Sequence, residues 1–219
     1  MPNELVKIDD LLGGLSLDKY TEEDFNASRA GGGADFLPRI QLMTANAAKC
    51  KEGSFPTNHY ALVENQSYKD LGGNVDVLII CFRPKALEIG DGVVASHDTE
   101  SELFGQIVER ASQPDSGCMY GPEFLVWIPS EKRFATFFMG SKSARRESPA
   151  VKSRLKAAAT LGARKVTTSK YTWFAPSCVA CTTPLTAAPQ PEDLGRVVES
   201  FLNPPAPTAE PADTSSRSR

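Results

Sequence analysis

The chain has 219 residues, of which 41% are hydrophobic, and a net charge of −3. This composition is sufficient for one sizeable core, and no run of about 18 apolar residues is present, so we expect no membrane-spanning helix and no membrane partner. The acidic N-terminus lacks the apolar core of a signal peptide, which favours a cytoplasmic location, in a host cell if the chain is viral. The five cysteines are expected to be reduced thiols.

The first half of the chain is expected to be rich in strands. Residues 1–35 are predicted to form a flexible N-terminal arm, followed by strands over 36–43, 59–63 and 75–82. The last of these is apolar on both faces, so it is predicted to be a central strand that ends at Pro84. The glycines of 90–92 predict a turn between two hairpin strands. A helix is expected over 99–111, capped by Thr99 or Ser101, and a polar loop over 113–122.

The second half continues with a predicted hairpin of strands 124–128 and 133–139. Ser148 and Pro149 are suited to the N-cap and first position of a helix that Gly162 ends. Residues 164–181 read as a long β segment, with an interruption at Pro176 as one alternative. An amphipathic helix is predicted within 187–202, and its apolar face consists of Leu194, Val197, Val198 and Phe201.

These elements predict a mainly β fold with a few helices, in the α+β class. Residues 36–186 are expected to form the β-rich domain that carries the function. Residues 203–219, rich in proline, alanine and serine, are predicted to be a flexible, disordered tail.

Basic residues are concentrated in one part of the chain. Residues 132–170 contain eleven basic side chains and one acidic side chain, Glu147, for a net charge of +10. Residues 1–131 carry a net charge of −11, and residues 171–219 carry −2. Such asymmetry is typical of proteins with a polyanionic partner, most often nucleic acid. The alternative is a solvated face that pairs with the acidic half of the same chain.

Aromatic side chains alternate with these cations. Binding of single-stranded nucleic acid needs cations along the backbone and flat side chains on which bases stack. On this basis the candidate binding residues are Arg133, Phe137, Lys142, Arg145, Arg146, Lys152, Arg154, Lys156, Arg164, Lys165, Lys170, Tyr171 and Trp173. The alternative for an aromatic residue at strand spacing, such as Phe137, is an ordinary place in the core.

The order of short strands, a mid-chain helix and a second run of strands is compatible with a small β-barrel of the OB type. Over about 36–185, including the stretches RFATFFMGSKSARRE and KYTWF, the chain resembles the single-stranded-DNA-binding replication proteins of tailed bacteriophages. This resemblance implies an OB-like barrel that coats single-stranded DNA, rather than RNA, during replication or recombination and without sequence preference.

Motifs that would define a reaction are lacking in the sequence. Cys178 and Cys181 have the spacing of a metal or redox pair, but they fall in an expected strand, where residues three apart point to opposite faces. His59 and His97 have no evident triad context. We therefore expect a non-catalytic protein without metal or cofactor. The alternative function is a virion structural, decoration or scaffold-like protein that self-associates through its basic and acidic regions.

Overall fold

The computed structural model describes residues 37–64, 67–90, 93–113, 115–185 and 187–203. The predicted N-terminal arm, and the predicted tail beyond Asn203, lie outside the described residues. The elements in chain order are β1 (Arg39–Leu42), α3 (Ala48–Lys51), β2 (Tyr60–Glu64), β3 (Ser67–Gly72), β4 (Val75–Gly90), β5 (Val93–His97), α4 (Phe104–Arg110), β6 (Cys118–Ile128), β7 (Arg133–Phe138), α5 (Lys142–Lys152), β8 (Ala157–Thr167), β9 (Thr172–Ala180) and α6 (Pro191–Leu202).

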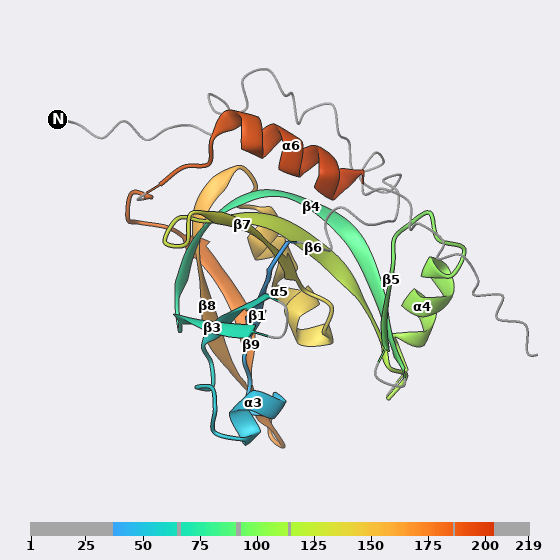
Figure 1. Cartoon of the computed structure of the whole chain (residues 1–219). Helices are drawn as coiled ribbons and strands as arrows, with labels where there is room; N and C mark the ends of the chain where they lie inside the picture. The colour runs from blue at the N-terminus through green and yellow to red at the C-terminus, as the bar shows by residue number, and fades with distance from the viewer. Residues whose placement is uncertain (1–36, 65–66, 91–92, 114, 186, 204–219) are drawn as a thin grey trace, which may run out of the picture.

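The nine described strands form one strongly curled, half-barrel sheet (Figure 1). Their order is β3-β2-β1-β7-β6-β4-β8-β9, with β5 paired to the far part of β4. The pairs are antiparallel except β1 with β7, which is parallel. The prediction of a mainly β fold with a few helices and a barrel-like core is thus confirmed. An OB barrel has five strands, so this sheet is larger than the resemblance implies.

Strand β4 runs through the whole arch of the sheet (Figure 1). It pairs with β8 over Val75–Ile79, with β6 along most of its length, and with β5 over Ala86–Gly90. The prediction that Pro84 ends this strand is wrong, because Pro84 faces Pro122 of β6 across the ladder. Alternate pairs in an antiparallel ladder exchange no N–H···O bonds, so two opposed prolines fit at such a pair.

Both faces of the central strands are buried, as the apolar run of β4 predicts. Alternation sends Val77 and Ile79 into the core inside the curl, and it sends Leu78 and Ile80 to the outer face. Helix α6 covers that outer face (Figure 1) with its buried side chains Leu194, Val198, Phe201 and Leu202. The predicted amphipathic helix over 187–202 is therefore confirmed as Pro191–Leu202.

A buried hydroxyl ties the two sides of the curl together. Tyr60 of β2 is fully buried, and its hydroxyl donates to the Gly162 carbonyl of β8 at 2.8 Å. Its ring meets Phe137 edge-to-face, with centroids 6.1 Å apart. Strands β2 and β8 are not neighbours in the sheet order, so this bond connects strands that backbone pairing leaves apart.

The helix predicted to begin at Ser148 and Pro149 is wrong in position. Helix α5 begins after Ser141, whose side chain accepts the Ala144 N–H, and Pro149 lies inside it. Proline cannot donate to the carbonyl four residues earlier, here that of Arg145. The Ser148 hydroxyl donates to that carbonyl instead, at 2.8 Å. A seryl hydroxyl thus replaces the missing backbone donor, and residues 157–162 are free to form β8 instead of helix.

The other predicted elements differ mainly at their ends. The hairpin of β6 and β7 is confirmed, and the long β segment over 164–181 becomes parts of β8 and β9, with Pro176 inside the terminal strand β9. Helix α4 begins at Phe104 without a side-chain cap, so capping by Thr99 or Ser101 is wrong. Strand β3 was not predicted, and β6 takes five residues, 118–122, from the expected polar loop.

The bond from Tyr60 predicts a specific loss of stability. Tyr60→Phe keeps the ring but leaves the Gly162 carbonyl without its donor, so we expect the free energy of unfolding to fall by about 1–3 kcal/mol. Urea denaturation followed by circular dichroism measures this. The control is Tyr171→Phe, at a side chain that is 72% exposed, with an expected change under about 0.5 kcal/mol. Equal stability of the two variants would contradict the role of the bond.

Candidate functional site

An open groove with a volume of about 1580 Å³ crosses the described part of the chain. One wall is formed by the second half of β4 with β5 and part of β6. The other parts of the lining come from β1, the end of β2, residues 44–46 and 57–58 between these two strands, β7, the start of α5 and the first half of β9. The groove therefore joins segments that lie more than 100 residues apart in the sequence.

Strand alternation determines which side chains of β4, β5 and β6 face the groove. The alternating residues that line it are Arg83, Lys85, Leu87 and Ile89 of β4, Val94 and Ser96 of β5 with Asp98 just beyond, and Met119 and Glu123 of β6; Pro84 and His97 border the groove as well. The opposite face of these strands packs Ala86 and Cys118 against Ile107 of α4. The wall thus has a charged half near Arg83 and an apolar half towards Ile89.

A buried ion cluster lies at the charged half of the wall. Arg83 and Glu123 are only 8% and 3% exposed, and the Arg83 Nε donates to Glu123 Oε2 at 2.9 Å. The Lys85 ammonium donates to Glu123 Oε1 at 2.8 Å. Arg83 also donates to the Phe201 carbonyl at the end of α6. Two cations thus share one carboxylate, which leaves this spot with a net positive charge.

Asp98 lies on the same wall and is only partly satisfied. It is 7% exposed, and its Oδ1 accepts the backbone N–H groups of Glu100 and Ser101 at 3.1 and 3.2 Å. Its Oδ2 is buried and has no hydrogen-bond partner in the described part of the chain. Burial raises the pKa of the Asp98 carboxyl, although the two N–H groups and the charge of Arg83 act in the opposite direction.

The start of α5 and the start of β9 line the groove from another side. Helix α5 packs against β9, and Trp173 and Phe174 of β9 are half-buried in the groove lining. Lys142 and Arg146 are exposed, one helical turn apart on α5, and neither has a polar partner among the described residues. Of the predicted binding residues, Trp173 and Phe137 line the groove and none of the cations does. Lys142 and Arg146 lie outside the lining, on the helix whose start contributes Ser141, Ser143 and Ala144 to it.

Three of the predicted basic residues are occupied by local partners. Arg133 makes a two-bond pair with the Glu64 carboxylate, at 3.0 and 2.7 Å. Arg145 donates to the Tyr120 and Gly140 carbonyls and lies 4.0 Å from the centroid of the Tyr120 ring. Arg164 pairs with Glu147. The alternative of pairing with the acidic half of the chain therefore applies to Arg133, whereas Arg164 pairs within the basic segment and Arg145 is held by carbonyls and a ring.

Other predicted cations lie at the far end of α5. This helix of eleven residues is about 16 Å long, and its last residue, Lys152, places its ammonium over the Phe82 ring at 4.3 Å. Arg154 and Lys156 follow it in the turn to β8. None of these three side chains lines the groove, so the structure does not bring the whole basic segment to one surface.

The predicted aromatic residues differ in their exposure. Phe137 is 2% exposed, packed in the core against Tyr60, which leaves no face for a base. The next residue, Phe138, is half-buried in the groove lining. The Phe138 ring lies so close to Gly140 that a Cβ atom at position 140 would fall 2.2 Å from the ring. Tyr171 is exposed on the hairpin between β8 and β9, which also carries the exposed Lys165 and Lys170.

Sequence reasoning missed the charged wall of the groove. Arg83, Lys85 and Glu123 fell within or beside segments that were expected to end strands or form a loop. Alternation of Arg83, Lys85 and Leu87 about Pro84 was the available signal, but the proline concealed it.

The charge of the groove lining is balanced in its described part. Its three basic side chains are Arg39, Arg83 and Lys85, and its three acidic side chains are Glu64, Asp98 and Glu123. Attraction for an anion must come from the rim.

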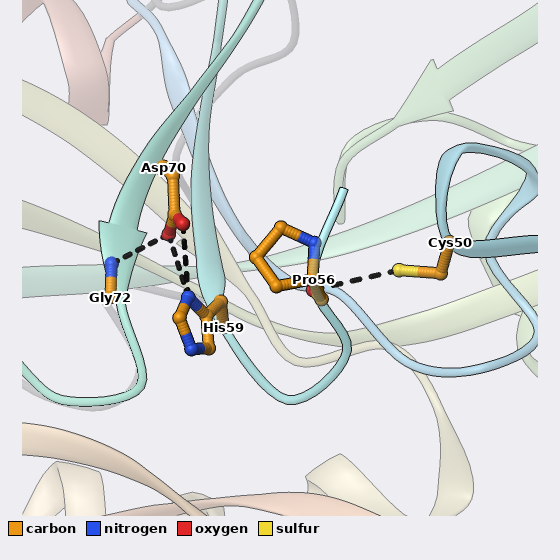
Figure 2. Close-up of polar contacts among 5 residues, drawn as sticks. All are labelled: Cys50, Pro56, His59, Asp70 and Gly72. Carbon is orange, nitrogen blue, oxygen red and sulfur yellow. Dashed lines mark hydrogen bonds and ion pairs between the residues drawn. The ribbon is translucent and has the colours of Figure 1, made fainter. Parts of the chain in front are cut away.

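His59 forms a polar pair outside the groove lining. Its Nδ1 lies 3.0 Å from both carboxylate oxygens of Asp70, and the Gly72 N–H donates to the same carboxylate (Figure 2). Burial acts to raise the pKa of Asp70, but the bonds from Gly72 and His59 outweigh it and lower the pKa. Figure 2 shows the Cys50 thiol directed at the Pro56 carbonyl and not at the imidazole. The imidazole of His59 therefore bonds Asp70, and the Cys50 thiol bonds elsewhere.

Two further features of the described residues concern metal binding and membrane insertion. Cys178 lies on β9 and Cys181 just after its end, and the described residues contain no group of three or more side chains suited to hold a metal ion. No helix in the described ranges is long and apolar enough to cross a membrane.

Comparison of the chain with protein-family models, curated proteins and solved structures found no significant match. The resemblance to phage replication proteins therefore stays a prediction from the sequence.

The ion cluster predicts a large stability effect. Glu123→Gln removes the charge that Arg83 and Lys85 share, so we expect the free energy of unfolding to fall by about 3 kcal/mol or more. Glu88→Gln is the matched control, because Glu88 pairs with Arg110 at a largely exposed site, where about 0–1 kcal/mol is expected. Chemical denaturation of both variants measures the difference. Equal effects would show that the buried cluster does not stabilise the fold.

Proposed function

We propose that the protein binds single-stranded nucleic acid in the groove and catalyses no reaction. The observation that carries the proposal is a long open groove lined by Trp173 and Phe174 of β9 and by the start of α5. The same helix presents Lys142 and Arg146, which are exposed and lie outside the lining. Coating of single-stranded DNA during phage replication or recombination is the role that this binding would serve.

The proposal rests on two complementary interactions. Bases stack on aromatic side chains with about 1–3 kcal/mol each, and every base has a face that can stack. Phosphates attract the unpaired cations of the rim, which lie on α5 and on the hairpin between β8 and β9. The apolar half of the groove wall, including Leu87, Ile89 and Val94, offers further surface to bases.

Because the lining itself is balanced in charge, the rim supplies the electrostatic attraction. The exposed cations on α5 and on the hairpin between β8 and β9 are Lys142, Arg146, Lys165 and Lys170, which we assign to the rim because these two elements contribute neighbouring residues to the lining. Four contacts with a single strand correspond to a slope of about −3 for log affinity against log salt. This slope is far shallower than the slope that eleven phosphate contacts would produce, because the other basic residues are paired with neighbours or lie elsewhere on the structure.

Reversal of the α5 cations tests the site. We expect Lys142→Glu combined with Arg146→Glu to weaken binding of all single-stranded sequences and to make the salt slope shallower by about 1–2. Fluorescence anisotropy of a labelled oligonucleotide, titrated at several salt concentrations, measures both.

The matched control is Lys132→Glu combined with Arg196→Glu, which changes the net charge equally. These two residues are exposed and lie away from the start of α5, Lys132 at the turn between β6 and β7 and Arg196 on α6, a helix that contributes no residue to the groove lining. Equal loss in both double variants would indicate attraction by net charge alone. Unchanged binding in the α5 variant would overturn the proposed site.

Tryptophan fluorescence provides a direct test of stacking. The chain has two tryptophans: Trp127 is 7% exposed and donates to the Ala187 carbonyl, whereas Trp173 is half-buried in the groove. We expect an oligonucleotide to quench the emission, and Trp173→Phe to abolish the quenching while weakening binding by less than Trp173→Ala, which loses about 1–3 kcal/mol. Quenching that persists in Trp173→Phe would contradict stacking at this position.

A structural or scaffold-like role is the second candidate. Val179 is 59% exposed on β9, which ends the sheet order and has no strand on its outer edge among those described. An exposed apolar side chain at a free sheet edge favours pairing with another copy. Pro176 lies in the same strand and cannot donate to such a pair, so we rank this role below nucleic-acid binding. Stable oligomers that exclude an oligonucleotide would reverse that order.

A further inference from the structure

We infer that the groove contains a subsite that reads one base, with a preference for guanine, in which Asp98 accepts hydrogen bonds from the edge of the base. The inference deepens the proposed function and rests on it. Its basis is the Asp98 carboxylate on the groove wall, which has one oxygen satisfied by backbone and the other without a partner in the part of the chain that the structure describes.

Such a group needs an explanation, because a buried carboxylate oxygen without a donor is costly and rare. Burial also raises the pKa of Asp98, which shows that the charged form is poorly compensated. The nearby ion cluster contrasts with it: both oxygens of Glu123 accept from Arg83 or Lys85. A ligand that supplies N–H donors would satisfy the remaining Asp98 oxygen, once a side-chain rotation exposes it to the groove.

The surroundings of Asp98 resemble a base-binding site in both their polar and apolar parts. Lys85 precedes and Asp98 follows the last paired residues, Ala86 and His97, and both side chains line the groove. The charge of Arg83, two residues before Lys85, acts on the Asp98 carboxyl. The Lys85 ammonium gives one hydrogen bond to Glu123 and has further donors. Leu87, Val94 and Met119 continue the same wall as an apolar surface. One base could therefore stack on this surface with its edge towards Asp98 and Lys85.

Guanine fits this pair of groups best. Its Watson–Crick edge has N–H donors at N1 and N2, which suit a carboxylate, next to the O6 acceptor, which suits an ammonium group. Thymine presents one N–H between two carbonyls, and a carboxylate would repel those oxygens. Adenine and cytosine have one amino group beside an acceptor nitrogen, so each can satisfy only part of the site. Proteins that bind extruded bases read this edge in the same way.

The experiment compares oligonucleotides that differ in one base. Anisotropy is measured with the full chain and labelled strands of about twelve thymidines, with the central base kept as thymine or replaced by guanine or by hypoxanthine, which lacks the N2 amino group. We expect the guanine strand to bind about tenfold more tightly than the all-thymine strand, with the hypoxanthine strand between them. Equal affinities for the three strands would overturn the inference and leave the proposed function intact.

Asp98→Asn identifies the residue responsible. Asparagine can keep the backbone bonds of the turn but lacks the carboxylate, so we expect all three strands to bind with similar affinity. The thermal midpoint should rise or stay the same, because a buried charge has been removed. Asp193→Asn on α6, outside the groove lining, should retain the preference for guanine. A preference that survives in Asp98→Asn would overturn the assignment.

A further measurement separates this inference from the proposed function. If no strand binds, the proposed function fails, and the subsite is then tested with guanosine and thymidine monophosphates at high concentration by thermal shift. A rise in midpoint with the guanine nucleotide that Asp98→Asn abolishes would support the subsite. Absence of such a shift would overturn it.

Discussion

The described structure depends on β4, which pairs with β8, β6 and β5 along its sixteen residues and is buried on both faces from Val77 to Cys81. The first half of the strand lies between the core of the curl and α6, and the second half lies between the groove and α4. The change occurs around Pro84, where a buried ion cluster replaces apolar contacts. Because Arg83 bonds both Glu123 and the last turn of α6, this cluster connects the helix-covered half of the strand to the groove half.

The distribution of charge in space differs from its distribution along the chain. The basic segment carries a net charge of +10, but Arg133, Arg145 and Arg164 are held by neighbouring acidic groups or carbonyls. Lys152, Arg154 and Lys156 lie outside the groove lining. Attraction of a polyanion would therefore depend on the few cations at the rim, and stacking and shape would provide much of the affinity for a strand.

Two buried carboxylates on one wall of the groove, those of Glu123 and Asp98, differ in how completely they are hydrogen-bonded. Glu123 is fully bonded, and such a network stabilises a fold because no member is left unsatisfied. Asp98 is bonded on one oxygen only. A site that stabilised the fold alone would gain from a neutral residue at this position. Under the proposed base-binding subsite, the hydrogen-bond donor for the second Asp98 oxygen comes from a ligand and not from the protein.

The sequence by itself determined the elements whose signals are local. Apolar runs and alternation predicted β2, the first half of β4, the hairpin of β6 and β7, and the buried face of α6, because each depends on a periodicity within one segment. Only the tertiary structure decided where α5 begins, since Ser148 makes Pro149 tolerable, and how far β4 continues, since Pro122 lies opposite Pro84. It also decided which cations and aromatics share a surface, because residues from β4, α5 and β9 meet through strand pairing and sheet curvature that no single segment encodes.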